Sequence, residues 1–98
     1  MAFVQLIEFQ TDRIDEFDAA LDDWMRESEG WRTPTRSVRA TDRDRPRTYV
    51  QIVEFPSYEA AMENSARTET NKLAERLAAL CSEPPIFRNF DVQRQEAL

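Results

Sequence analysis

One seven-residue pattern typical of a β-strand occurs twice in this 98-residue sequence. The copy at residues 3–9 reads FVQLIEF, and the copy at residues 49–55 reads YVQIVEF. Position by position, both have an aromatic residue, Val, Gln, two aliphatic residues, Glu and Phe. A hydroxyl residue of the kind that caps helices follows each copy at the same offset, at Thr11 and at Ser57. The repeat therefore predicts two related halves, each a strand followed by a helix.

The first helix is expected to begin at a cap formed by Thr11 or Asp12 and to end at Gly30, the only glycine in the chain. Its apolar residues recur at the i, i+3, i+4, i+7 spacing of one buried stripe. That predicted stripe consists of Ile14, Phe17, Leu21, Trp24 and Met25.

The rest of the chain reads as a hairpin, a broken helix and a last strand. A polar edge strand is predicted at 33–41, a turn rich in Asp and Pro at 42–46, and the second repeat strand at 47–55. Ser57 is expected to cap the second helix. Weak helix propensity between Asn64 and Thr70 predicts a break there, with Thr68 capping a second segment that runs to about Leu80. A last strand is predicted at 86–92.

The element order β-α-β-β-α-β with an internal repeat predicts one α+β domain over residues 1–98, with 93–98 as a flexible polar tail. This arrangement is the ferredoxin-like fold, with four antiparallel strands in the order 4-1-3-2 and both helices on one face. The two repeat strands are apolar on both faces, although helices cover only one. Because monomers rarely expose a large apolar face, we expect a homodimer with two sheets packed face to face.

Composition excludes several kinds of chemistry. The chain has no histidine and one cysteine, Cys81, so histidine-based acid–base catalysis and the commonest zinc, iron and haem sites are not expected. We therefore predict no metal and no cofactor. The net charge of −6 argues against nucleic-acid binding. No apolar run approaches the length of a membrane span, so neither a membrane partner nor a location other than the cytoplasm is expected.

Charge is distributed unevenly along the chain. The stretch from Glu8 to Glu29 holds nine acidic residues and two arginines, whereas the stretch from Arg32 to Arg47 holds six arginines and two aspartates. One interpretation is an acidic helix and a basic hairpin that both face water. The other is that the two regions meet across a subunit interface.

The repeat places polar side chains at matched positions of the central strands. Gln5 and Gln51 lie in the middle of these strands, and they either bond to each other across the pseudo-twofold axis or line a cavity and orient a ligand. Glu8 and Glu54 lie near the strand ends, where each is either exposed or paired with arginine, or serves as a general base. No catalytic residue is assigned.

Three further residues are candidates for a ligand pocket. Trp24 lies on the apolar stripe, where it either packs in the core or contacts a ligand. Arg39 on the edge strand is a candidate anchor for an anion, and Asn64 lies at the predicted helix break, where a short amide can meet a ligand.

The segment from Ile52 to Asn64, IVEFPSYEAAMEN, resembles a strand–turn–helix segment of the dimeric α/β-barrel superfamily, and within it the small antibiotic-biosynthesis-monooxygenase-like proteins. In that resemblance, Phe55 stands for the family's tryptophan and Asn64 for its histidine. The missing histidine argues against the haem degradation carried out by some members. Oxygenating members use Asn, Trp and Tyr side chains around an aromatic substrate. Asn64 matches the asparagine, and the Trp and Tyr positions have no assigned counterpart.

Two classes of function follow. The first is a cofactor-independent monooxygenase-like enzyme acting on an aromatic or polyketide-like molecule, in which amides hold the substrate oxyanion. The second is a homodimer of the same fold without catalysis, which binds a small apolar molecule or has a structural role. Amides converging on a pocket would favour the enzyme, and a space filled by Phe, Trp and Met would favour the second class.

Overall fold

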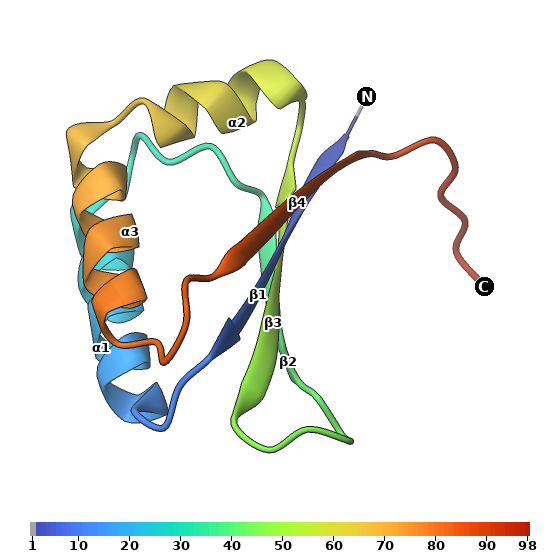
Figure 1. The fold of residues 1–98 in the computed structure, drawn as a ribbon. Helices are drawn as coiled ribbons and strands as arrows, with labels where there is room; N and C mark the ends of the chain where they lie inside the picture. Colours follow the sequence, from blue (N-terminus) through green and yellow to red (C-terminus); the bar gives the residue numbers. More distant parts are fainter. Residues whose placement is uncertain (1) are drawn as a thin grey trace.

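A computed structural model describes residues 2–98, so Met1, the first residue of the predicted domain, lies outside the described residues. The elements follow the predicted order, with the second helix divided in two. They are β1 (Phe3–Gln10), α1 (Ile14–Glu27), β2 (Arg36–Thr41), β3 (Thr48–Phe55), α2 (Tyr58–Ser65), α3 (Thr68–Ala79) and β4 (Ile86–Asp91). Residues 93–98 form no helix or strand and run away from the body of the domain (Figure 1). Their flexibility stays a prediction.

The four strands form one antiparallel sheet in the order β2-β3-β1-β4, which confirms the predicted ferredoxin-like topology. β1 pairs with β3 in a register that places Phe3 opposite Phe55 and Phe9 opposite Tyr49. At the centre of this ladder Leu6 lies opposite Ile52, and these residues occupy the same position of the repeat. The pseudo-twofold axis of the repeat therefore passes between the two central strands.

The first helix begins and ends slightly inside its predicted bounds. Its N-cap residue is Arg13, without a side-chain cap, whereas Thr11 or Asp12 was expected. Thr11 instead stabilises the turn before the helix. Its hydroxyl accepts a hydrogen bond from the Arg13 backbone N–H at 3.0 Å and donates one to the Leu80 carbonyl at 2.6 Å. At the other end the C-cap is Ser28. Gly30 lies two residues later, with the positive φ of 93° that glycine adopts readily.

The predicted break in the second helix is confirmed. Ser57 caps α2 by accepting a hydrogen bond from the Ala60 backbone N–H at 3.0 Å. α2 then ends at Ser65, and α3 begins at Thr68 with Arg67 rather than Thr68 as its N-cap. The break leaves Asn64 in the last turn of a short helix, at the point where the chain changes direction.

All three helices lie on the same side of the sheet, and the other side is bare (Figure 1). We call the side toward the helices the inner face and the bare side the open face. Not all of the predicted helical stripe is buried: Phe17 is, whereas Met25 is 49% exposed, so its inclusion was wrong. No helix among residues 2–98 is both long enough and apolar enough to cross a membrane. The cytoplasmic location stays a prediction.

Candidate functional site

The register of the sheet decides which side chains reach the inner face. Paired residues of neighbouring antiparallel strands share a face, and the face alternates along each strand. Because buried Phe3, Phe9 and Phe55 fix the inner side, their alternating partners on all four strands point the same way. The middle of the inner face is thus formed by Gln5, Ile7, Ser37, Arg39, Gln51, Val53, Phe87 and Asn89.

The core is concentrated at the two ends of this face. At one end Phe3, Phe55 and Ala61 form a buried cluster, with the Phe3 and Phe55 ring centroids 6.1 Å apart. At the other end Phe9 stacks on Phe17 of α1, with ring centroids 4.2 Å apart. On the sheet, the residues between the clusters are half-buried or exposed, although Ala20 of α1 is buried. Solvent therefore reaches the centre of the inner face, where the predicted glutamines lie.

The two glutamines bond to the outer strands and not to each other. Gln5 donates from its Nε2 atom to Asn89 Oδ1 on β4 at 3.1 Å. Gln51 accepts from Arg39 Nε at 2.7 Å and donates to Ser37 Oγ at 2.5 Å, both on β2. The interpretation of a glutamine pair across the pseudo-twofold axis was therefore wrong. Hydrogen-bonding side chains instead extend from β4 to β2 across the middle of the sheet.

Arg39 is the most constrained side chain of this row. Its guanidinium carbon lies 5.5 Å from the centroid of the Phe9 ring, 5.4 Å from that of Phe17 and 5.9 Å from that of Tyr49. Arg39 Nη2 donates to Asp18 Oδ1 on α1 at 2.6 Å. The side chain of Arg39 is 23% exposed, and that of Asp18 is 49% exposed. A cation over aromatic faces, partly shielded from water, is held more strongly than one at the surface.

The Arg39–Asp18 pair also shows how the acidic stretch from Glu8 to Glu29 meets the basic stretch from Arg32 to Arg47. Asp18 belongs to the acidic helix and Arg39 to the basic hairpin, and they are joined within one chain. A second pair joins Glu8 and Arg45, at 3.0 Å. The two regions are thus neither fully solvated nor dependent on a subunit interface for their contact.

Asn64 lies at the other end of the helical layer and is 7% exposed. Its Oδ1 atom accepts a hydrogen bond from the Thr33 backbone N–H at 3.4 Å, and the Thr33 hydroxyl donates to the Ala60 carbonyl at 2.6 Å. These bonds join the helix break to the loop between α1 and β2. The side-chain amide nitrogen of Asn64 makes no hydrogen bond with any of residues 2–98, so it is available as a donor.

Trp24 connects α1 to the same region. Its ring meets that of Trp31 edge to face, with centroids 6.2 Å apart, and its Nε1 atom donates to Thr70 Oγ1 on α3 at 3.3 Å. The guanidinium of Arg67, at the helix break, lies 4.6 Å from the Trp31 ring centroid. Trp24 and Asn64 are therefore both close to the break, whereas Gln51 and Arg39 contact each other at the far edge of the sheet.

Sequence reasoning missed polar residues that bond to the predicted glutamines and to Arg39, among them Asn89 on β4 and Asp18 on α1. The pattern of β4 places Ile86 and Phe90 on one face, so Asn89 was already assigned to the other. What the sequence lacked was the register that brings Asn89 opposite Gln5. Asp18 was counted with the exposed acids of the first helix, and nothing in its spacing distinguishes it from them.

The remaining chemical candidates give no metal or nucleophilic site. Within residues 2–98 no group of three or more Cys, Asp or Glu side chains is gathered as metal ligands would be. Burial raises the pKa of the Cys81 thiol, which keeps it protonated and poorly nucleophilic. The sequence prediction of no metal and no cofactor stays a prediction.

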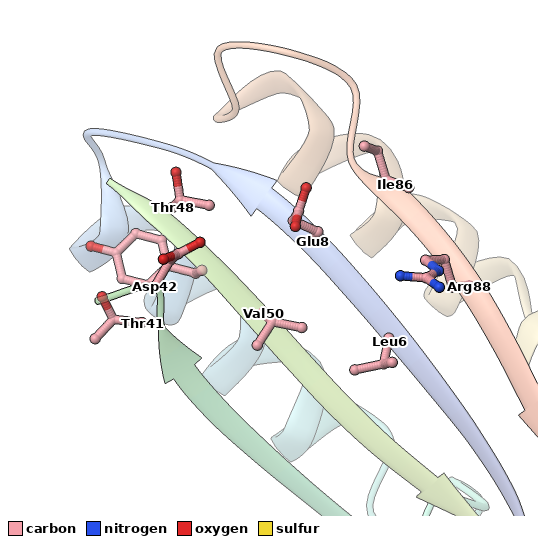
Figure 2. A pocket seen from close by; sticks show the side chains of 9 residues that line it. Leu6, Glu8, Thr41, Asp42, Thr48, Val50, Ile86 and Arg88 are labelled. Carbon is pink, nitrogen blue, oxygen red and sulfur yellow. The ribbon is translucent and has the colours of Figure 1, made fainter. Parts of the chain in front are cut away.

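The open face has a different character. Its register places a band of aliphatic and aromatic side chains across all four strands, made up of Val4, Leu6, Val38, Ala40, Val50, Ile52, Ile86 and Phe90. Figure 2 shows Leu6, Glu8, Val50 and Arg88 on the near side of the sheet, with the helices behind it. An open groove of about 450 Å³ runs between them. None of the five predicted ligand-pocket residues lines it.

No protein-family model matches the sequence, and the curated proteins give no match. Solved structures do match over almost the whole chain. SnoaB from Streptomyces nogalater, described as a cofactor-independent oxygenase, is 17% identical, with a TM-score of 0.78 over 96% of this chain and 95% of its own.

Two further structures are equally similar in shape at lower identity. A conserved protein from Methanosarcina mazei Go1 is 8% identical, with a TM-score of 0.80 over 95% of this chain and 94% of its own. A proposed antibiotic biosynthesis monooxygenase from Caulobacter crescentus CB15 is also 8% identical, with a TM-score of 0.79 over 95% and 91%. At these identities the likeness concerns the fold. The chain thus shares the ferredoxin-like α+β fold of antibiotic-biosynthesis-monooxygenase-like proteins, as the sequence resemblance predicts.

Proposed function

We propose that this protein is a cofactor-independent monooxygenase-like enzyme for an aromatic or polyketide-like small molecule, which it binds on the inner face. The observation that carries the proposal is the row of hydrogen-bonding side chains across the middle of that face. Asn89, Gln5, Gln51 and Arg39 form it, where most proteins of this size would place aliphatic residues. The match to SnoaB, an oxygenase that is described as independent of cofactors, supports the same class of reaction.

The chemistry needs positioning and charge stabilisation more than it needs a protein base. Loss of a proton from a hydroxylated polyaromatic leaves an anion that reacts with oxygen. When a ring CH₂ becomes C=O, one oxygen atom stays on carbon and the other leaves as water with the two hydrogens. No external reductant is required. Amide N–H groups directed at the developing oxyanion lower the barrier. Gln5 and Gln51 would supply them in the middle of the inner face, and Asn64 would supply one at the helix break.

Asn64 has a defined part in this proposal. Thr33 holds its carbonyl oxygen, so the amide nitrogen has a fixed direction and is free to donate. Preorganised donors of this kind stabilise transition-state charge, because they do not have to reorient during the reaction. Trp24, half-buried and close to the same helix break, provides an aromatic wall for the substrate.

We also propose that the enzyme is a homodimer joined through the open face. The apolar band on that face includes Ile86, which is 54% exposed, and Phe90, which is 40% exposed. Glu8 and Arg88 lie on the same face and interrupt the band near Ile86. Soluble monomers rarely expose apolar residues on every strand of one sheet face in this way. The Arg36–Glu54 pair at the edge of the band gives it a polar rim. Two such faces in contact would form the face-to-face dimer expected from the sequence, which the family resemblance identifies as a dimeric α/β barrel.

The test is oxygen uptake with 1,8-dihydroxyanthrone, followed with an oxygen electrode and by absorbance of the quinone product. No metal, flavin or haem is added. We expect uptake above the rate of autoxidation, and a loss of about tenfold or more in kcat/KM for Gln51→Leu. Gln10→Leu is the matched control, because it removes the same amide from the end of β1 on the open face. Equal rates for the two variants would exclude the inner face as the site.

The alternative is a non-catalytic homodimer that binds a small molecule or has a structural role. The aromatic clusters at both ends of the inner face are the feature that favours it, since they fill part of the space with Phe side chains. Binding of hydroxylated polyaromatics without oxygen uptake would support this reading over the enzyme.

A further inference from the structure

We propose that Arg39 binds the negatively charged group of a planar aromatic ligand, and that the Asp18 carboxylate holds this place in the free protein. The inference deepens the proposed function by naming the group that selects an ionised ligand, and it rests on that proposal only in placing the ligand on the inner face. It requires binding and not turnover.

The hydrogen bonds of Arg39 leave donors unused. A guanidinium has five N–H donors. Nε donates to Gln51, and Nη2 donates to Asp18. Nη1 makes no hydrogen bond with any of residues 2–98. The group therefore keeps donors on a fixed plane, which is the arrangement that binds carboxylates and phenolates with two parallel hydrogen bonds.

The surroundings fix the direction of those donors. The bond from Nε to Gln51 sets the rotation of the guanidinium, and the rings of Phe9, Phe17 and Tyr49 surround its carbon at 5.4–5.9 Å. An arginine that only neutralised Asp18 at the surface would need neither contact. Preorganisation of this kind reduces the entropy lost when a ligand binds.

The chemistry of the ligand follows from the face of α1 beside Arg39. Phe17, Leu21 and Trp24 lie along one face of this helix, with Leu21 and Trp24 half-buried. The eight residues from Phe17 to Trp24 span about 10 Å. A planar fused-ring molecule can lie along this apolar strip with its anionic end at Arg39. A short aliphatic acid would leave the strip uncovered.

Asp18 is placed as a competitor rather than as a permanent partner. It is about half exposed, so water screens its attraction to Arg39, and ion pairs of this kind contribute little to stability. Replacing one carboxylate by another anion at the same donors therefore costs little. A ligand anion that also covers the apolar strip gains contacts that Asp18 cannot make.

The experiment compares two ligands of the same shape. Anthraquinone-2-carboxylate is an anion at pH 7, and anthraquinone-2-carboxamide is its neutral counterpart. Their affinities are measured by isothermal titration calorimetry for the intact protein and for Arg39→Gln and Asp18→Asn. Two variants serve as controls. Arg43→Gln removes an exposed arginine from the turn that follows the same strand, and Asp22→Asn removes the same charge from the same helix at an exposed position.

We expect the intact protein to prefer the carboxylate, and Arg39→Gln to bind it about tenfold or more weakly without change for the carboxamide. Asp18→Asn should bind the carboxylate about two- to fivefold more tightly. Asp22→Asn and Arg43→Gln should alter the preference little, which separates a local effect from net charge. If Arg39→Gln fails to fold, the gain in Asp18→Asn decides the question.

Three results would overturn the proposal: equal affinity for the two ligands, no gain in Asp18→Asn, or no binding of either ligand. Absence of oxygen uptake with 1,8-dihydroxyanthrone would remove the proposed enzyme activity and leave this inference standing if the carboxylate preference and its two opposite mutational effects are present.

Discussion

Truncation of Phe55 tests whether the buried cluster at the α2 end of the inner face carries much of the stability. Phe55 is 4% exposed, ends a central strand, and packs with Phe3, Ala61 and Val53. Phe55→Ala removes a whole ring from a site where rigid strand backbone on either side limits collapse. Such truncations cost about 3–5 kcal/mol of the free energy of unfolding. This is a large share of the total of about 5–15 kcal/mol for a domain of this kind.

The matched control is Tyr58, three residues further along. Tyr58 is 52% exposed and meets the Phe3 ring edge to face, with centroids 5.6 Å apart. Tyr58→Ala therefore loses one aromatic contact, worth about 1 kcal/mol, and leaves no large cavity. For a chain of this length each kcal/mol shifts the Tm by about 4–8 °C, so Phe55→Ala should lower the Tm by about 12 °C or more.

The assay is thermal and urea denaturation followed by circular dichroism. All variants are compared at one protein concentration, because association would make the Tm depend on concentration. Equal midpoints for Phe55→Ala and Tyr58→Ala would contradict the argument. They would mean that the Phe3–Phe55 cluster is not where the free energy of folding is concentrated.

Three other variants each test one local feature of the structure. Asn64→Ala should cost about 1–3 kcal/mol in urea denaturation and speed hydrogen exchange at the Thr33 amide, since it removes the acceptor of that N–H. Gly30→Ala should cost about 1 kcal/mol through its positive φ alone, because an added Cβ meets no atom within 4 Å; Glu29→Ala is its control. The hydrogen bond from Arg76 lowers the pKa of Asp23, so the stability from this pair is present above the ordinary value of 3.8 and is lost as the pH falls below it. Asp23→Asn should therefore reduce the acid-induced drop in the urea midpoint, and an unchanged drop would show that the pair contributes nothing.

The fold could be predicted because the repeat carries information about register as well as about elements. Two copies of one strand related by a twofold axis have to pair antiparallel about a shared centre, which the structure places at Leu6 and Ile52. The helix break could be predicted for a local reason, since low helix propensity acts where it occurs. Helix caps were less predictable. Thr11 has a capping side chain, but it bonds to Leu80, a residue distant in sequence, while it supports the turn before α1.

The site could be predicted only in part, because its contacts depend on registers that the sequence leaves open. Alternation places Gln51 on a face, but only the length of the hairpin turn brings Arg39 opposite it. Asn89 is brought to Gln5 by the loop before β4, which has no pattern that fixes its geometry. The link from Asp18 to Arg39 further depends on the rotation of α1 over the sheet. The sequence therefore predicted which polar residues belong to the site better than it predicted the residues to which they form hydrogen bonds.

The two faces of the sheet are linked through stability. A chain of this length has a modest core, and here the core is further reduced, because the middle of the inner face holds amides and a guanidinium in place of aliphatic residues. Burial of the apolar band on the open face in a dimer would offset that deficit without filling the inner face. In the proposed dimer, covering the open face would therefore let the inner face stay partly hydrated in a stable fold. On this argument, adding a charge at Leu6 should weaken ligand binding on the opposite side of the sheet, through loss of the dimer.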